Sequence, residues 1–402
     1  GVVAVITGED TNGAYYGGGL KDLPVLARGR VRFAGERVAA VAAEDEDTAQ
    51  RALDLIDVEY EELPAVFEID EALADDAPIL HPDFNTYPGV VPAGAEVRGP
   101  FAPPRALAKP SNLYHHTLFE RGDVEQGFRE SDLIVERTYR TQRVHQGYLE
   151  PQTVLVRVNP DGVIEAWTGS KIPYRLRASL AAVAGVPEDR VVLHHTFIGG
   201  DFGGKGTPGI LPICYLLAKK TGRPVRMVND YIEEFSAGNP RHSVSITMKT
   251  GVKRDGTIVA HQVRFMVNSG AYAAFKPFGF IFGPTQAGAP YYKAQHTRIE
   301  SGHVYTNTVP GGFMRAPGEA QAFFALESHM DVIARELGMD PVEFRLRNLV
   351  ESGEEAATGE RLEAVRVKDA LRAAIEAAGF YAPKRPGVGR GIALGERPPG
   401  GG

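Results

Sequence analysis

The stretch "IGGDFGGKGT" at residues 198–207 could be a loop that binds the phosphates of a nucleotide, or a glycine-rich turn with another role. It follows the pattern of a phosphate-binding loop as far as Lys205, but such a loop then needs a hydroxyl for magnesium, and the next residue is Gly206. Thr207 comes one position too late. What remains is a set of glycines around Phe202, which lets the backbone approach a bulky partner and exposes amides that could bind anionic oxygens. We call this stretch the glycine loop; a tight turn between a strand and a helix is the simpler interpretation.

A second stretch of small and turn-forming residues, "GGFMRAPGEAQ" (311–321), surrounds Arg315 just before a helical pattern. The N-terminus of a helix favours negative charge, so this stretch is a candidate contact for an anion. A capped helix start with a surface arginine is the simpler alternative. We call residues 311–318 the arginine loop.

The composition is that of a globular protein and indicates two domains: 402 residues, 43% of them hydrophobic and 24% charged. The net charge of -7, with no basic run interleaved with aromatic residues, argues against nucleic acid as a partner. The single cysteine, Cys214, excludes a disulfide framework, and it excludes an iron–sulfur cluster or a Cys-type zinc site held by this chain alone. We interpret it as a small buried residue.

No stretch approaches the roughly 20 apolar residues of a membrane span, and the N-terminus lacks the order of a signal peptide. The sequence therefore predicts a cytoplasmic protein with no membrane partner. The histidine pairs at 115–116 and 194–195, with His145, lack the spacing of three ligands, so no metal site formed by side chains is expected. The chain begins inside an apolar run without an initiator Met and ends in loop composition, so we expect a fragment.

Periodicity predicts mixed elements in the N-terminal part. Residues 1–10 form an apolar, strand-like run, and residues 30–44 suggest two strands that turn at Gly35. A helical pattern begins at residue 46 and is followed by strand-like alternation at 56–63.

The following residues, 81–112, are dense in Pro and Gly, and we expect an ordered linker there. Beyond it, the patterns predict a strand at 133–144, a hairpin at 153–169, a helix at 174–185 and a strand at 190–198. A buried helix ended by Gly222 and a further strand are expected next. Strands at 243–252 and 257–267, joined by a turn from Arg254 to Gly256, and an amphipathic helix at 319–339 follow. A last helix is expected to have Asp340 as N-cap, Pro341 at its first position and Glu343 closing a capping box.

In this order, several segments resemble the molybdenum-binding subunit of the xanthine dehydrogenase and aldehyde oxidase family of molybdenum hydroxylases. They are "GVVAVITGED", "HQGYLEPQ", "IGGDFGGK", "GAYAAF" and "FMRAPGEAQAFFALESHMDVIARELGMDPVEFRLRNLV". The resemblance implies an α+β fold, in which an α/β hammerhead domain precedes the first of two molybdopterin-binding domains. We place the hammerhead at 1–80 with its N-terminal part missing, the linker at 81–112 and the molybdopterin-binding domain at 113–402.

The resemblance also implies a cofactor and partners. The cofactor is molybdopterin, as its cytosine dinucleotide, with molybdenum held by the pterin and not by a protein side chain. In the family, electrons leave through [2Fe–2S] clusters to FAD. Because this chain has one cysteine, it cannot hold the clusters, and the resemblance implies an iron–sulfur subunit and an FAD subunit as partners. A second molybdopterin domain or subunit completes the site for a small-molecule substrate.

The resemblance also assigns the family's site positions to residues of this chain, motif by motif. Cofactor-binding positions fall on Gly200, Phe202, Gly203, Arg315, Ala316 and Lys171. Lys171 stands where the family has a glutamine that hydrogen-bonds a molybdenum oxygen. Substrate-pocket positions fall on Gly206, Gly283 and Pro317, where xanthine-specific members keep a glutamate, an arginine and a stacking phenylalanine.

Xanthine is therefore a poor substrate prediction. No catalytic residue is assigned, because the glutamate that acts as base in the family belongs to a region that this chain does not reach. Glu396 superficially resembles it, but its position directly after the first domain's helices argues against that role.

The function predicted from the resemblance is oxidation of an aldehyde or an N-heteroaromatic carbon with water as oxygen donor. The alternative is a non-catalytic scaffold or assembly subunit of the same fold, suggested by Lys171, Gly206 and Gly283. A simple anion- or nucleotide-binding module built on the glycine loop is a third possibility. The copper-containing carbon monoxide dehydrogenases are disfavoured, because their loop carries a cysteine where this chain has Ala316 to Gly318.

Overall fold

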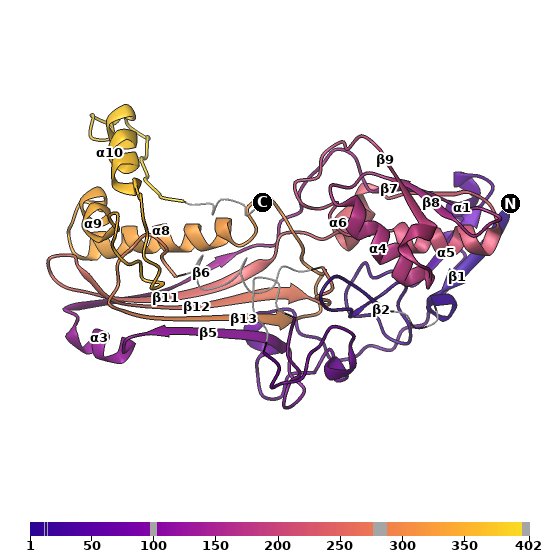
Figure 1. Cartoon of the computed structure of the whole chain (residues 1–402), viewed down its shortest axis with the longest axis horizontal. Coiled ribbons are helices and arrows are strands. Elements are labelled where there is room, and N and C mark those ends of the chain that lie inside the picture. Colours follow the sequence, from indigo (N-terminus) through magenta and orange to yellow (C-terminus); the bar gives the residue numbers. More distant parts are fainter. Residues whose placement is uncertain (12, 14, 97–102, 276–287, 396–402) are drawn as a thin grey trace.

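Two mixed sheets organise the chain, which is seen whole in Figure 1. The computed structural model describes residues 1–11, 13, 15–96, 103–275 and 288–395. A five-stranded sheet with its helices forms one end of the elongated molecule, and a four-stranded sheet packed against the N-terminal strands forms the other (Figure 1).

The elements of the N-terminal part are short. They are β1 (Val2–Thr7), η1 (Gly8–Thr11), β2 (Tyr15–Tyr16), β3 (Leu23–Pro24), β4 (Ala39–Ala43), α1 (Glu46–Leu53), α2 (Ile69–Ala72) and η2 (Phe84–Thr86).

Longer elements build the two sheets and cover them. The strands are β5 (Leu113–Arg121), β6 (Leu133–Thr141), β7 (Thr153–Val158), β8 (Ile164–Thr168), β9 (Val191–His195), β10 (Val225–Val228), β11 (Ser243–Val252), β12 (Ile258–Gly270) and β13 (His296–Tyr305). The helices are α3 (Val124–Glu130), α4 (Pro173–Ala184), η3 (Glu188–Arg190), α5 (Leu211–Thr221), α6 (Tyr231–Ala237), α8 (Glu319–Glu336), α9 (Pro341–Asn348) and α10 (Val367–Ala377). None of the helices that the structure describes has both the length and the apolar character needed to cross a membrane.

The five-stranded sheet has the order β5-β13-β12-β11-β6 and is antiparallel except between β12 and β13. Along the first eight residues of β11 every second side chain is buried, among them Ile246 and Met248. These side chains pack in one core with Leu326, Met330 and Ile333 of α8. The amphipathic helix predicted at 319–339 is therefore confirmed, and its apolar stripe covers one face of this sheet.

The four-stranded sheet has the order β10-β7-β8-β9. The hairpin predicted at 153–169 is confirmed, since β7 and β8 pair antiparallel and Gly162 takes a φ of 83° in the turn. Strands β8 and β9 are parallel, which requires a crossover, and α4 supplies it. This helix ends as predicted near residue 185, where Gly185 adopts a left-handed conformation.

Helix α5 is buried on two sides. Cys214 and Tyr215 pack in the core of the four-stranded sheet, whereas Leu217 packs with Ile6 and Leu26 of the N-terminal part. The predicted buried helix ended by a glycine is confirmed, with Gly222 at φ 65°. Burial raises the pKa of the Cys214 thiol to about 12, which suits a structural residue and not a reactive one.

Two strand predictions in the N-terminal part are wrong. Gly35 does turn the chain, with φ 99°, but residues 30–34 form no strand, and β4 pairs with β1 instead. Residues 56–63 form no strand either, and Tyr60 is 59% exposed. Alternation makes a strand only where a neighbouring strand pairs with its backbone hydrogen-bonding groups, and none of the described strands pairs with this segment.

The first part of the Pro/Gly-rich stretch, around Phe84 and Tyr87, lies against the end of the five-stranded sheet. Phe84 and Tyr87 are buried there, and the Phe84 ring lies 6.1 Å from that of Tyr114 and 6.3 Å from that of Tyr305. The stretch is held at its end by Asn112, whose Oδ1 accepts a 3.0 Å hydrogen bond from the Leu80 amide.

The start of α9 confirms one capping prediction and contradicts another. The Asp340 carboxylate accepts hydrogen bonds from the amides of Val342 (2.9 Å) and Glu343 (3.0 Å), and Pro341 occupies the first turn. Glu343 does not close a capping box, because its Oε1 lies 3.6 Å from Nη2 of Arg347, one turn further along. An oppositely charged residue at i+4 competes with the cap for that carboxylate.

Buried histidines make the stability of the fold depend on pH. Burial lowers the pKa of His81 and His329 to about 3 and that of His261 to about 4. The unfolded chain takes up protons near pH 6.5, whereas the folded chain does not until much lower pH. The free energy of unfolding is therefore complete above pH 6.5 and falls toward pH 4, by ~1.4 kcal/mol per pH unit for each histidine.

We expect the urea midpoint of the protein to fall steadily between pH 7 and pH 5. His329 donates to or accepts from Tyr139 and Thr250, so His329→Gln is expected to be less stable at pH 7 but to show a shallower pH slope. Urea titrations at several pH values measure both quantities. A variant slope equal to that of the parent protein would contradict this account.

Candidate cofactor site between two loops

The glycine loop links β9 to α5 and contains three unusual backbone conformations at its centre. Gly200 and Gly203 have φ of 104° and 110°, and Phe202 has φ 46°, in the left-handed region that side chains disfavour. A Cβ on Gly203 would lie 2.6 Å from the carbonyl oxygen of Phe313. Glycine is required there because a second segment of backbone approaches too closely for any side chain.

Asp201 closes the glycine loop on itself. Its two carboxylate oxygens accept hydrogen bonds from the amides of Gly203 (2.9 Å) and Lys205 (2.7 Å). Lys171 lies beside it, with Nζ 3.2 Å from Oδ2 of Asp201 and a side chain that is 47% exposed. A Cβ on Gly206 would lie 3.6 Å from Cε of Lys171, so these two predicted positions share one edge of the loop.

Lys205 faces into the protein and not toward a ligand. Its ammonium pairs with Glu150 and lies 5.0 Å from the ring centroid of Tyr148. Burial alone would raise the pKa of Glu150, but the hydrogen bonds from Lys205 and the Gly199 amide hold it below its ordinary value. A phosphate-binding loop presents its lysine to the phosphates, so the geometry agrees with the sequence in rejecting that interpretation.

The arginine loop lies directly beside the glycine loop. The Arg315 amide donates a 2.7 Å hydrogen bond to the carbonyl of Phe202. Ala316 has φ 56°, a second strained residue, and Pro317 follows it. The Arg315 side chain is exposed and makes no hydrogen bond or ion pair with the described part of the chain.

Two side chains outside the loops hold them in place. Gln146 donates from Nε2 to the carbonyls of Asn239 and Phe313, both at 2.7 Å. Arg241 donates to the carbonyls of Arg315 (2.6 Å) and Ala316 (3.0 Å). Sequence reasoning missed both roles, although Gln146 lies in the quoted segment "HQGYLEPQ".

Glu234 supports the glycine loop from below. Its carboxylate is buried and accepts hydrogen bonds from the Tyr148 hydroxyl (2.5 Å) and the Gln152 amide (2.6 Å). Burial, together with this hydrogen bond, holds the pKa of Tyr148 well above its ordinary value. A Cβ on Gly200 would lie 2.9 Å from Cβ of Tyr148, so the tyrosine forms the floor of the loop. No pattern around Glu234 signals this role.

The structure brings most of the predicted site residues together. The two loops meet through Phe202 and Arg315, and Lys171 stands at the edge of the glycine loop. Gly283 lies outside the described residues. Across the residues that the structure describes, no group of His, Cys, Asp and Glu side chains has the arrangement of a metal site.

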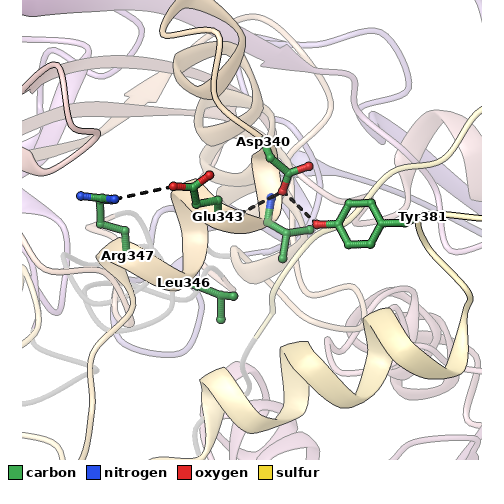
Figure 2. A pocket seen from close by; sticks show the side chains of 6 residues that line it. Asp340, Glu343, Leu346, Arg347 and Tyr381 are labelled. Carbon is green, nitrogen blue, oxygen red and sulfur yellow. Dashed lines mark hydrogen bonds and ion pairs between the residues drawn. The ribbon is translucent and has the colours of Figure 1, made fainter.

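A shallow pocket beside α9 is a weaker candidate (Figure 2). It is lined by Asp340, Val342, Glu343, Leu346, Arg347 and Tyr381. Figure 2 shows that its polar groups are turned toward one another, with the Tyr381 hydroxyl 3.0 Å from Asp340 Oδ1. These groups cap α9 and pair along it, so we assign the pocket no ligand.

Family models match both parts of the chain. The model of the molybdopterin cofactor-binding domain matches residues 107–349, and that of the a/b hammerhead domain of aldehyde oxidase and xanthine dehydrogenase matches residues 1–64. The α+β fold predicted from the resemblance is thereby confirmed. The exact domain boundaries at residues 80 and 112 stay a prediction.

Curated relatives and solved structures agree with the family models. The chain is 36% identical over 350 residues to a probable xanthine dehydrogenase subunit of Bacillus subtilis, covering 87% of this chain and 43% of that protein. It is 31% identical over 344 residues to the nicotinate dehydrogenase large molybdopterin subunit of Eubacterium barkeri, covering 86% of this chain and 74% of that subunit.

The structure of the aldehyde oxidoreductase from Desulfovibrio gigas superposes with a TM-score of 0.81 at 28% identity, covering 95% of this chain and 41% of that one. The chain thus spans less than half the length of two of these three proteins. With a domain model matching more than half of its residues, the chain belongs to the molybdenum-binding subunits of the xanthine dehydrogenase and aldehyde oxidase family.

Proposed function

We propose that this chain forms one side of the molybdopterin site of a molybdenum hydroxylase. The cofactor would lie against Gly200, Phe202, Gly203, Arg315, Ala316 and Lys171. The observation that carries the proposal is the hydrogen bond from the Arg315 amide to the Phe202 carbonyl, which joins two strained loops into one surface. Strained backbone persists where the surrounding structure holds it, and it concentrates at ligand sites.

The chemistry of this surface fits an anionic, bulky cofactor. Gly203 has no room for a side chain, so the glycine loop and the arginine loop meet there backbone to backbone. The Ala316 amide has no acceptor among the described residues, and Lys171 adds a half-exposed cation. Amide donors and a cation suit the oxygens of a pterin phosphate or of a metal centre. When bound, the cofactor supplies two-electron oxidation chemistry, while this chain binds and orients it.

We further propose that the assembled enzyme is cytoplasmic and oxidises an aldehyde or an N-heteroaromatic carbon with water as oxygen donor. The cofactor form would be the cytosine dinucleotide. An iron–sulfur subunit would carry the [2Fe–2S] clusters, an FAD subunit the flavin, and a second molybdopterin domain or subunit the catalytic base. The presence of one buried cysteine supports an external location for the clusters. Xanthine is not proposed, because Gly206 offers no carboxylate to hold a purine.

Elemental and pterin analysis of the purified complex tests this function. We expect about one molybdenum and one cytosine dinucleotide per chain, and transfer of ¹⁸O from labelled water into the product of an aldehyde or an N-heteroaromatic compound. A complex that is active without molybdenum would end the proposal.

The same experiment separates the enzyme from the alternative, a scaffold subunit. The Lys171–Asp201 ion pair favours that alternative in one respect, since it engages the lysine that replaces the family's glutamine. A folded complex with neither molybdenum nor oxidising activity, in cells that load other molybdenum enzymes, would establish the scaffold function instead.

A further inference from the structure

Arg241, not Arg315, is the arginine that shapes the arginine loop. It lies just before β11, and its backbone is held on both sides: its amide donates to the Val144 carbonyl (2.8 Å), and Gly312 donates to the neighbouring Pro240 carbonyl (2.8 Å). The guanidinium then reaches the carbonyls of Arg315 and Ala316. A third contact, 3.3 Å to Oε1 of Gln321 on α8, anchors the side chain from the helix.

The two carbonyl contacts determine where an amide points. In a trans peptide the carbonyl and the following N–H point in opposite directions. Because the Arg315 carbonyl faces the guanidinium, the Ala316 N–H must face away from it. The Ala316 carbonyl also faces the guanidinium, and the next residue, Pro317, has no N–H to present.

The Ala316 amide is thus left as a donor directed away from Arg241. It has no acceptor in the part of the chain that the structure describes, and Ala316 holds a φ of 56° that costs about 1–3 kcal/mol for a residue with a Cβ. A conformation of this cost needs something to stabilise it, and the bidentate contact of a guanidinium with two successive carbonyls does so.

We infer that Arg241 is a positioning residue, which holds the Arg315–Ala316 peptide so that the Ala316 amide is available to the bound cofactor. This inference rests on the proposed function of the two loops as a cofactor surface. Lysine is not an adequate substitute, because an ammonium is a compact point charge whose donors all sit on one nitrogen, without the planar fork that spans both carbonyls.

The test compares Arg241→Met and Arg241→Lys with Arg137→Met in the complete complex. Arg137 on β6 is 51% exposed and pairs with Glu336 at the C-terminal end of α8, so it serves as a surface control. We expect molybdenum content to fall at least ~10-fold in Arg241→Met and less in Arg241→Lys, with an altered Mo(V) electron paramagnetic resonance spectrum in the molecules that keep the metal. The control should match the parent complex.

Hydrogen exchange on the cofactor-free complex makes the result independent of metal loading. We expect exchange at the Arg315 amide to rise at least ~10-fold in Arg241→Met, while the Gly312 amide, bonded to Pro240, stays protected. Unchanged exchange at Arg315, or an Arg241→Met complex with parental molybdenum content and spectrum, would overturn the inference. A parent complex without molybdenum would instead defeat the proposed function and leave the exchange result to decide on Arg241. Loss of protection at Gly312 as well would mean general unfolding and would also overturn the specific role.

Discussion

Glu327→Ala is expected to lower the free energy of unfolding by about 3 kcal/mol, which would make it one of the most damaging single changes far from the two loops. Glu327 on α8 accepts hydrogen bonds from Arg345 Nε (2.8 Å) and from the Tyr292 hydroxyl (2.6 Å). Arg345 is completely buried. Removing the carboxylate leaves that guanidinium with Asp331 as its remaining acidic partner, 2.7 Å from Nη1 and 47% exposed.

Urea unfolding followed by circular dichroism measures this effect. Glu343→Ala is the matched control, since it removes a carboxylate from α9 that is 61% exposed and pairs with Arg347 on the surface. That control is expected to change stability by less than about 0.5 kcal/mol. The double variant Glu327→Leu, Arg345→Met should lose less free energy of unfolding than Glu327→Leu and Arg345→Met lose together as single variants, because no charge remains buried. Equal losses for Glu327→Ala and Glu343→Ala would show that the buried pair has no special weight.

Local patterns predicted the elements that local forces build. The hairpin at 153–169 has turn residues between two alternating runs, and α8 has an apolar stripe at helical spacing; both signals lie within about 20 residues. Patterns failed where a partner strand decides the outcome, as at 56–63, which has alternation but no neighbour among the described strands. Strand β13 was missed for another reason: it is an interior strand of its sheet but buries polar residues such as Thr297 and Ser301, so its composition does not look like a core strand.

In the candidate site, too, the sequence indicates some residues and not others. The glycines of the glycine loop and the small residues around Arg315 signal close backbone approach, and the structure places the two loops side by side. The residues that hold the loops carry no such signal. Glu234 and Arg241 are ordinary charged residues in the sequence, and only the fold brings one under Tyr148 and the other against two carbonyls. Supporting contacts of this kind follow from tertiary structure and cannot be derived from spacing.

Gly203→Ala is expected to cause the largest loss at the proposed cofactor surface. Gly203 has φ 110°, which a residue with a Cβ rarely adopts, and the new methyl group would lie 2.6 Å from the Phe313 carbonyl oxygen. That oxygen belongs to backbone held by Gln146, so it cannot move aside as a flexible side chain would. The two loops must then separate, which breaks the hydrogen bond from the Arg315 amide to the Phe202 carbonyl.

We therefore expect Gly203→Ala to lower molybdenum content at least ~10-fold and to cost about 2 kcal/mol in stability. Gly206→Ala is the control in the same loop, since its φ is not in the left-handed region and its Cβ would meet nothing closer than 3.5 Å. Molybdenum analysis and thermal melting of the two purified complexes give the comparison. The control should keep both its molybdenum and its melting temperature. If Gly203→Ala also kept its molybdenum and its melting temperature, the cofactor would be bound without close contact between the glycine loop and the arginine loop. The proposed role of that contact would then be wrong.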